Sequence, residues 1–233
     1  MNLIFDIGFN VGEFTQTCFN RYKDCNVIAV EANPSLVKLA SPHFFTNYNF
    51  TLHNNLVSEK TNEEIDFYVS PNTTGVSTAS TQFMENSRFT KGSKNLEKNS
   101  IKWEAPIKIQ SITIDSMIER YGMPDLIKID VEGYELNVLK GLTQKANDIC
   151  WEWHEEENDT LFKSLEHLQS IGYTQFGVIG WFDESDVFAK ATFSDKGDPY
   201  LEYPKNFYAL EDLELHKLIN PERRVNYGMF FAK

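Results

Sequence analysis

The order of elements in the first thirty-one residues constrains the fold more than any other feature of the sequence. A short apolar run over residues 2–7 ends at a glycine turn and has the length of a buried parallel strand. A helical pattern of apolar residues follows from Gly12 to Tyr22, and a second apolar run, residues 27–30, ends at Glu31. A strand, a helix and a second strand in this order are typical of α/β folds with a parallel sheet.

The same alternation continues along the chain. Asn33-Pro34 provides an N-cap and a first helical proline, which predicts that the next helix begins there. Further strands are predicted over residues 50–53 and 56–57, 125–131, 148–154, 173–179 and 225–232. Further helices are predicted over residues 114–121, up to Gly141, and from a cap at Thr160 to Gly172.

Two segments interrupt this pattern. Residues 60–110 begin with the alternation of a half-buried antiparallel strand and continue with a polar stretch without a clear period over 71–105. Residues 181–222 are acidic and irregular. We therefore expect one domain over residues 1–233, in which these two segments are insertions that cover the substrate.

Charge excludes some classes of partner. The 233 residues include 22 Lys+Arg and 34 Asp+Glu, which give a formal net charge of −12. Unaided binding to phosphate backbones needs basic surfaces, so a nucleic-acid partner is not expected. One local exception is the basic stretch 86–102, which could attract an acidic acceptor such as a nucleotide-linked sugar.

The expected location follows from cysteine usage and hydropathy. Three cysteines without a C-x-x-C pair predict free thiols in a reducing compartment. Apolar runs are too short for a membrane-spanning helix, and Asp6 interrupts the first one, which also lacks a basic flank. We expect a cytoplasmic protein that is a monomer or a homodimer.

The strongest local motif is D-I-G-F-N-V-G, residues 6–12, between the first strand and the first helix. Gly8 and Gly12 allow a tight turn and a close approach of the backbone to a ligand. Glu31, nineteen residues after Gly12, can accept hydrogen bonds from both hydroxyls of a ribose. The dinucleotide motif G-x-G-x-x-G and the P-loop are absent, which disfavours a nicotinamide oxidoreductase. A D-x-G-x-N-x-G turn with a following acid is the pattern used for S-adenosylmethionine.

Five blocks resemble the FkbM-type S-adenosylmethionine-dependent methyltransferases. They are FDIGFNVGEF (5–14), AVEANP (29–34), HNNLVS (53–58), GVSTAS (75–80) and IKIDVEGYELNVLKG (127–141). The resemblance implies a Rossmann-like class I fold, a three-layer sandwich whose mostly parallel seven-stranded sheet has an antiparallel last strand. It also implies O-methylation, commonly of hydroxyls on sugars or polyketide-like products.

The resemblance assigns most of the cofactor site. The residues that match cofactor contacts are Asp6, Gly8, Phe9, Asn10, Gly12, Glu31, Ala32, Asn33, Asn54, Asn55 and Asp130. Many relatives carry an N-terminal extension that helps to cover the site, whereas here the cofactor loop begins at residue 6. We therefore expect the cover to come from residues 71–105 and 181–205.

Candidate catalytic residues lie at the ends of two strands predicted to be neighbours. Asp130, Glu132 and His154 are the catalytic candidates, with His154 the first choice as base because its ordinary pKa is near 6.5. Further candidates for substrate contacts are Ser77, Thr78, Glu152 and Trp181. Asp130, Glu132, Glu152 and Glu155 could alternatively hold Mg²⁺, but their spacing matches no recognised metal loop, and we expect no metal.

The sequence thus predicts a methyltransferase that acts on a hydroxyl of a sugar, nucleotide sugar or glycan. Three alternatives remain open: an O-methyltransferase of another small molecule, a non-catalytic protein that binds S-adenosylmethionine, and an RNA or protein methyltransferase.

Overall fold

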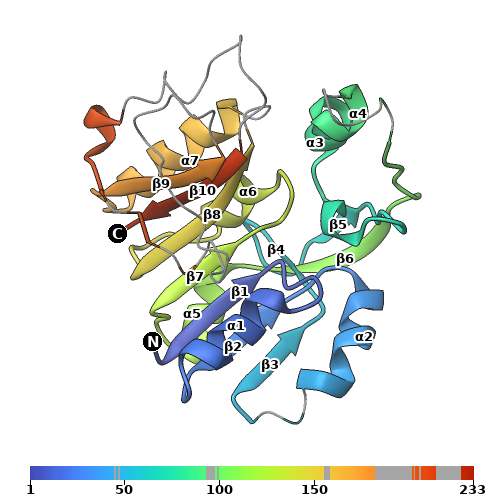
Figure 1. Ribbon diagram of the computed structural model, residues 1–233, viewed down its shortest axis with the longest axis horizontal. Helices are drawn as coiled ribbons and strands as arrows, with labels where there is room; N and C mark the ends of the chain where they lie inside the picture. The colour runs from blue at the N-terminus through green and yellow to red at the C-terminus, as the bar shows by residue number, and fades with distance from the viewer. Residues whose placement is uncertain are drawn as a thin grey trace.

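The computed structural model describes residues 1–44, 46, 48–92, 98, 100–154, 158–181, 201, 203–204, 206–213 and 227–233. Within these residues the main element is a twisted seven-stranded sheet with the order β3-β2-β1-β7-β8-β10-β9 (Figure 1). Its strands are β1 (Leu3–Ile7), β2 (Asn26–Val30), β3 (Phe50–His53), β7 (Leu126–Ile129), β8 (Asp148–His154), β9 (Phe176–Trp181) and β10 (Tyr227–Ala232).

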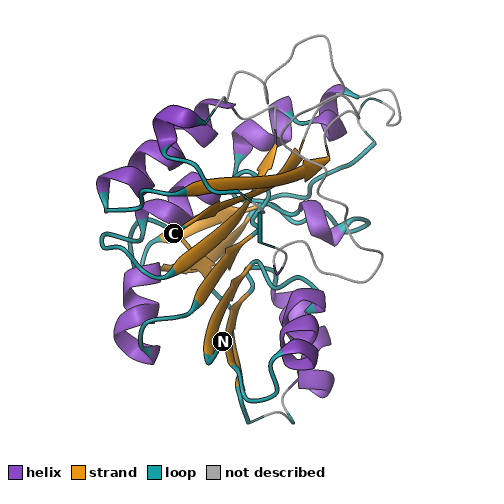
Figure 2. Cartoon of the chain, turned by 60° about the vertical axis from the view of Figure 1, so that its left-hand side comes forward, coloured by secondary structure: helices purple, strands orange, loops and turns teal. Residues whose placement is uncertain are grey.

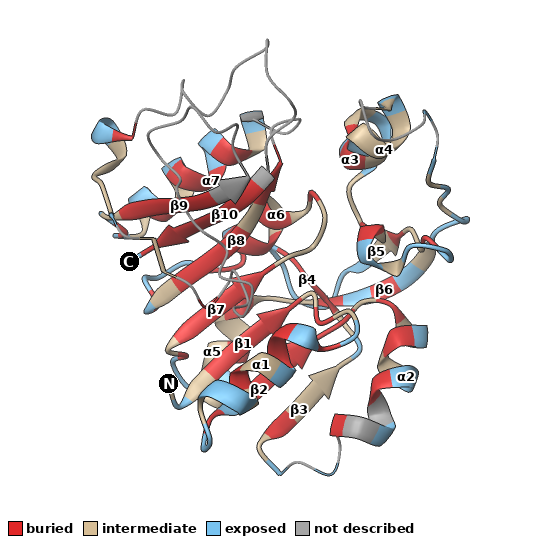
Figure 3. Ribbon diagram, in the orientation of Figure 1, coloured by how far each residue is buried: buried red, intermediate tan, exposed pale blue. Residues whose placement is uncertain are grey.

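Strand direction confirms the predicted topology. The strands from β3 to β8 are parallel, whereas β10 is antiparallel to both of its neighbours, β8 and β9. The sequence therefore predicted correctly a mostly parallel sheet with an antiparallel last strand. The parallel strands show near-continuous burial because helices cover both faces of the sheet (Figures 2 and 3).

Two hydrophobic layers flank the sheet. On one face, α5 (Ile114–Tyr121), α6 (Glu135–Lys140) and α7 (Asn158–Ser170) pack on residues such as Phe5, Ile129 and Trp151. On the other face, α1 (Glu13–Arg21) and α2 (Pro34–Phe44) pack on residues such as Ile4 and Ala29. Successive strand residues alternate between the two layers, as the pleat requires.

Several element boundaries differ from the prediction, and the starts of β9 and α7 are two examples. β9 begins at Phe176 rather than at residue 173, because Tyr173 is fully buried and its hydroxyl bonds to the carbonyl of Asn147. α7 begins at Asn158, so the predicted cap, Thr160, lies inside the first turn, where its carbonyl accepts a hydrogen bond from Ser164.

The first insertion builds a small second sheet. Its order is β4-β6-β5, formed by β4 (Leu56–Val57), β6 (Ile107–Ile112) and β5 (Glu64–Phe67), with β5 antiparallel to β6. The predicted antiparallel strand around Phe67 is therefore confirmed, although its burial, exposed at Glu64 and partial up to Phe67, does not alternate. Two short helices, α3 (Thr81–Asn86) and α4 (Arg88–Lys91), follow within the polar stretch. Most of the second insertion, residues 181–222, lies outside the described residues.

All three cysteines belong to the described part of the chain, where they are buried free thiols, as expected. Among the described helices, none has the length and the apolar character that crossing a membrane would require.

Candidate functional site

A cavity of about 150 Å³ lies where β1, β2 and β7 end. These strands are neighbours and parallel, so their carboxyl ends meet at one edge of the sheet, where α/β proteins bind ligands. The predicted residues that line the cavity are Gly8, Asn10, Glu31, Ala32, Asn55, Ser77, Asp130 and Glu132. The structure thus brings together residues from all five blocks quoted above, and Asp130 and Glu132 are those of the last block.

The glycine turn forms one wall of this cavity. Gly8 has a φ of 82°, and a Cβ atom there would lie 1.7 Å from the carbonyl oxygen of Asp130. The N–H groups of Gly8 and Phe9 both donate to the carbonyl of Val30, at 3.0 and 3.1 Å. Only glycine satisfies the dihedral and the close contact together, which explains the residue at this position.

Glu31 lines the cavity beside this turn. Its Oε2 accepts a hydrogen bond from the N–H of Asn10 and its Oε1 one from the N–H of Asn33, each at 2.7 Å. Burial raises the pKa of Glu31, while these two N–H groups oppose that rise. Each oxygen keeps a second lone pair, so the fixed carboxylate can accept the two hydroxyls of a ribose. The residues present therefore fit an adenosine-bearing cofactor.

Several other residues predicted to bind the cofactor lie behind the cavity wall. Asp6 is fully buried and accepts a hydrogen bond from the hydroxyl of Thr15 at 2.6 Å. The ring of Phe9 packs against Phe44 and Phe50, with centroids 5.3 and 5.6 Å away. These contacts hold the shape of the turn, and the role of both residues in binding the cofactor stays a prediction.

The remaining residues predicted to bind the cofactor do not line this cavity, and their role in binding stays a prediction. Gly12 has a φ of 85° and would place a Cβ atom 2.5 Å from the ring of Phe9. Asn33 immediately precedes α2, and its Oδ1 accepts the N–H of Ser35 at 3.0 Å. Asn54 donates to the carbonyls of Glu31 and Ala32 at 2.9 and 3.1 Å, which fixes the chain beside the acid.

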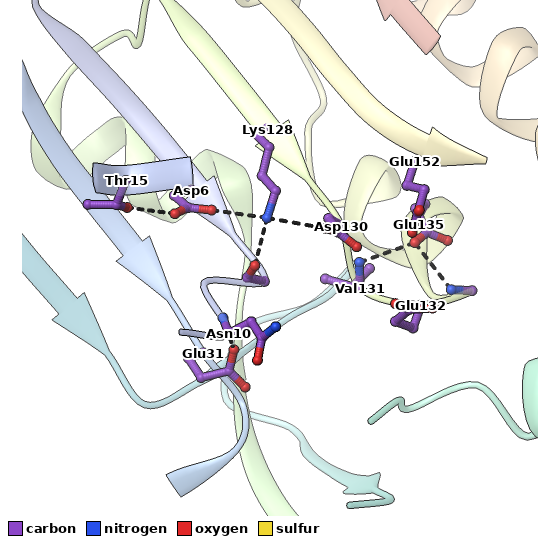
Figure 4. Close-up of polar contacts among 12 residues, drawn as sticks. Asp6, Asn10, Thr15, Glu31, Lys128, Asp130, Val131, Glu132, Glu135 and Glu152 are labelled. Carbon is purple, nitrogen blue, oxygen red and sulfur yellow. Dashed lines mark hydrogen bonds and ion pairs between the residues drawn. The ribbon is translucent and has the colours of Figure 1, made fainter. Parts of the chain in front are cut away.

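Lys128 is a residue of this region to which the sequence assigned no role. Its side chain is 3% exposed, and its Nζ donates to the carbonyl of Gly8 at 2.6 Å (Figure 4). The same atom lies 3.1 Å from Oδ1 of Asp6 and 3.6 Å from Oδ2 of Asp130. A lysine inside a buried strand needs charged partners, so its position in I-K-I-D was a signal that could have identified it.

The loop after β7 is strained at Glu132. This residue has a φ of 54°, and its carbonyl accepts a hydrogen bond from the hydroxyl of Thr78 at 2.7 Å. Oε1 of Glu135 accepts the N–H groups of Val131 and Gly133, each at 3.2 Å, and so closes the loop (Figure 4). A left-handed conformation in a non-glycine residue is uncommon and concentrates at functional sites.

The side chain of Glu132 reaches the cavity from this loop. Its Oε2 is buried and has no hydrogen-bond partner among the described residues. Burial, with the nearby carboxylates of Glu152 and Asp130, raises the pKa of Glu132 well above its ordinary value. A carboxylate in this state is a stronger base than an exposed one.

His154 connects this acid to the inserted helices. Its Nε2 lies 3.1 Å from Oε2 of Glu152 and 3.6 Å from Oε2 of Glu132, while a guanidinium nitrogen of Arg88 lies 3.0 Å from its Nδ1. Burial lowers the pKa of His154, but the Glu152 carboxylate outweighs burial and raises it to about 9. For Glu152, burial alone would raise the pKa, but the neighbouring His154 outweighs burial and lowers it.

Arg88 and Glu152 favour opposite charge states of this histidine. A guanidinium only donates hydrogen bonds, so it can bond to Nδ1 only when the ring is neutral and carries its proton on Nε2. Glu132, Glu152 and His154 offer possible metal-ligand atoms within 4.8 Å of one another. Glu155, the other ligand in the Mg²⁺ alternative, lies outside the described residues, and that alternative stays a prediction.

The residues predicted to contact substrate are divided among different places. Ser77 lines the cavity, and its Oγ accepts the N–H of Ser70 at 3.0 Å. Thr78 is fully buried, and its hydroxyl donates a hydrogen bond to the carbonyl of Glu132. Glu152 lies beside His154 on β8, and Trp181 ends β9, with its side chain outside the described residues.

Comparison with known proteins shows the family. Residues 6–174 match the profile of the methyltransferase FkbM domain. Among curated proteins, a search finds no match.

Solved structures give distant likenesses. The precorrin-6y C5,15-methyltransferase from Geobacter metallireducens GS-15 is 12% identical over 100% of this chain and 79% of its own, with a TM-score of 0.46. An S-adenosylmethionine-dependent O-methyltransferase from Thermotoga maritima is 12% identical over 100% of this chain and 59% of its own, with a TM-score of 0.40. Human methyltransferase-like protein 13 in complex with S-adenosylhomocysteine is 11% identical over 80% of this chain and 68% of its own, with a TM-score of 0.36.

The family profile covers more than half of the chain and includes the glycine turn, Glu31 and the strained D-V-E-G loop. The chain therefore belongs to the FkbM methyltransferase family, and its cofactor is S-adenosylmethionine.

Proposed function

We propose that the protein transfers the methyl group of S-adenosylmethionine to a hydroxyl of a sugar, nucleotide sugar or glycan. The observation that carries this proposal is the buried Oε2 of Glu132, which lacks a hydrogen-bond partner among the described residues and belongs to a side chain lining the cofactor cavity. An alcohol is a weak nucleophile at neutral pH, and a carboxylate with a raised pKa is suited to accept its proton.

The bound cofactor supplies an electrophilic methyl group, and the chain must align the acceptor with it. Glu31 holds the ribose, while Gly8 and Asn10 form the adjacent wall. Asp130, at the end of β7, lies between that wall and Glu132 and is the second candidate for contact with the reacting groups. Alignment of the reacting atoms in a fixed cavity can supply much of the rate enhancement in such a displacement.

Glu132 is the proposed base, and His154 is the proposed partner that orients it. Nε2 of His154 is paired with Glu152 and a guanidinium nitrogen of Arg88 lies 3.0 Å from its Nδ1, whereas Glu132 lines the cavity. As the acceptor oxygen forms its bond to the methyl carbon, the carbon–sulfur bond breaks and the hydroxyl proton passes to Oε2 of Glu132.

The inserted segment supports the choice of a small polar acceptor. Thr74, Gly75, Ser77 and Ala79 line the cavity, so the insertion completes the site. We propose a single domain over residues 1–233 in which insertions 60–110 and 181–222 cover the acceptor. Arg88 on α4 places positive charge beside His154 in a protein of net charge −12, which favours a nucleotide-linked or otherwise acidic sugar.

A methyl-transfer screen tests this function. Purified protein is incubated with S-adenosylmethionine carrying a trideuterated methyl group and with panels of nucleotide sugars and glycans, and products are identified by mass spectrometry. We expect one labelled methyl ether per acceptor. The Glu132→Gln variant should lose this product, whereas Glu119→Gln, which changes an exposed acid on α5, should form as much product as the wild type. Labelled amines, RNA or protein would contradict the proposal, as would cofactor binding without transfer to any hydroxyl.

A further inference from the structure

We propose that Lys128 is a positioning residue for the cofactor: its ammonium ties the glycine turn to the end of β7 and so sets the width of the cavity. Asp6, Gly8 and Asp130, the three residues it contacts, belong to two strand ends that form adjacent walls of the site. The inference uses the cofactor of the family and does not depend on which acceptor the protein methylates.

Strand register places the cluster. Asp6 on β1 pairs with Lys128 on β7, so their side chains lie next to each other on the same face of the sheet. That face is covered by α1, from which Thr15 bonds to Asp6 and the ring of Phe14 lies 5.7 Å from Nζ of Lys128. The ammonium is therefore enclosed by α1 on one side and can reach the cavity only through the Gly8 carbonyl and Asp130.

The contact with Gly8 acts on the part of the chain that meets the ligand. A charge-assisted hydrogen bond to a carbonyl is stronger than a neutral one, and here it holds the peptide of a residue with a φ of 82°. Two residues later, the N–H of Asn10 fixes Oε2 of Glu31. A shift of the Gly8 peptide would therefore displace both the turn and the carboxylate proposed to hold the ribose.

The contact with Asp130 acts on the other wall. The Asp130 side chain is 29% exposed and lines the cavity, whereas Lys128 and Asp6 are almost fully buried. Lys128 therefore orients a carboxylate that faces the ligand from a position that the ligand does not touch.

A charge-matched double variant tests the proposal. Asp6→Asn with Lys128→Met removes one negative and one positive charge together, so the buried cluster keeps its net charge and the variant avoids an unpaired buried carboxylate. We expect cooperative thermal unfolding with the dissociation constants of S-adenosylmethionine and S-adenosylhomocysteine raised at least tenfold, measured by calorimetry. Unchanged dissociation constants would overturn the proposal.

Thr15→Val is the matched control within the same cluster. It removes the bond between Thr15 and Asp6, on the side of the cluster away from the cavity, and we expect it to lower the melting temperature with less than a threefold change in both dissociation constants. If Thr15→Val weakens cofactor binding as much as the double variant does, Lys128 has a structural role alone and the proposal is wrong.

A measurement on the wild-type protein covers the case in which the double variant does not fold. In the lysine side-chain ¹³Cε–¹H spectrum, addition of S-adenosylhomocysteine should shift the Lys128 signal and leave that of Lys108, which pairs with Asp66 in the small sheet, in place. An unshifted Lys128 signal at saturation would contradict the proposal. None of these readouts requires an acceptor, so they fail or succeed independently of the proposed O-methylation.

Discussion

Glu132 combines a strained backbone with an acid whose proton affinity is raised. A left-handed non-glycine residue costs about 1–3 kcal/mol, and here the Thr78 hydroxyl and the Glu135 carboxylate hold the loop in place. Substitution of Glu132 by Gln keeps the shape of the side chain and removes the base. We expect kcat to fall at least about 100-fold, in line with general-base catalysis. The dissociation constant of S-adenosylmethionine should change less than threefold, because Glu31 and the turn remain.

The same residue predicts the direction of the pH dependence. A base acts only when deprotonated, and burial with the neighbouring carboxylates raises the pKa of Glu132 well above 4.5. The rate constant should therefore rise with pH through that raised pKa and then level off. A rate that falls with pH over this range would argue against Glu132 as the base, and Glu119→Gln should show the wild-type profile.

Gly8 and Gly122 form a matched pair of glycines with positive φ. At Gly8 a Cβ atom would lie 1.7 Å from the Asp130 carbonyl oxygen, whereas at Gly122, with a φ of 92°, it would meet nothing within 4 Å. Gly122→Ala should cost only the backbone strain of a conformation with φ 92° and ψ 176°, about 1–3 kcal/mol of unfolding free energy. Gly8→Ala should cost more and also abolish binding of S-adenosylmethionine, measured by denaturant unfolding and calorimetry. Equal effects of the two substitutions would show that the close contact is unimportant.

The end of β8 determines how stability depends on pH. His154 has a pKa raised from 6.5 to about 9, mainly because Glu152 outweighs its burial. A group with a raised folded pKa contributes its full stability below the unfolded pKa and loses it as pH rises through the folded one. His154→Gln should therefore lower the unfolding free energy by about 3 kcal/mol near pH 6. The difference in unfolding free energy between this variant and the wild type should narrow as pH rises through 9. A difference in unfolding free energy that stays constant across this range would contradict the pairing of His154 with Glu152.

Glu152 determines how stability depends on pH at the acidic end of the range. Its pKa is lowered by His154, so its contribution is present above its unfolded pKa and is lost as pH falls through the folded one. The strand end is therefore most stable between these two limits.

At the scale of the whole molecule, the sequence predicted the sheet well because buried parallel strands appear as continuous apolar runs. Glu31 and the glycine turn were predictable for the same reason, since a strand end fixes where its next residue lies. The contacts of Lys128 were not, because they depend on the register of β1 against β7. Nor was the contact of Arg88 with His154, which joins two segments sixty-six positions apart in the chain through an insertion without a clear period.

The position of β10 between β8 and β9 predicts the effect of a deletion. β10 pairs with both β8 and β9 and contributes the buried side chains Met229, Phe230 and Phe231. Deletion of residues 227–233 should therefore abolish the cooperative thermal transition seen by circular dichroism, whereas Lys233→Gln should preserve it. A truncated chain that still unfolds cooperatively would contradict this prediction.

The same strand has a consequence for synthesis on the ribosome. β10 follows every other strand of the sheet along the chain, yet it lies inside the sheet rather than at an edge. Until its residues leave the exit tunnel, β8 has an unpaired edge and β9 lacks its neighbour in the sheet. Unpaired edges promote association between chains. While β10 is still inside the tunnel, the edge of β8 is therefore open to pairing with other chains, and pairing with β10 closes it.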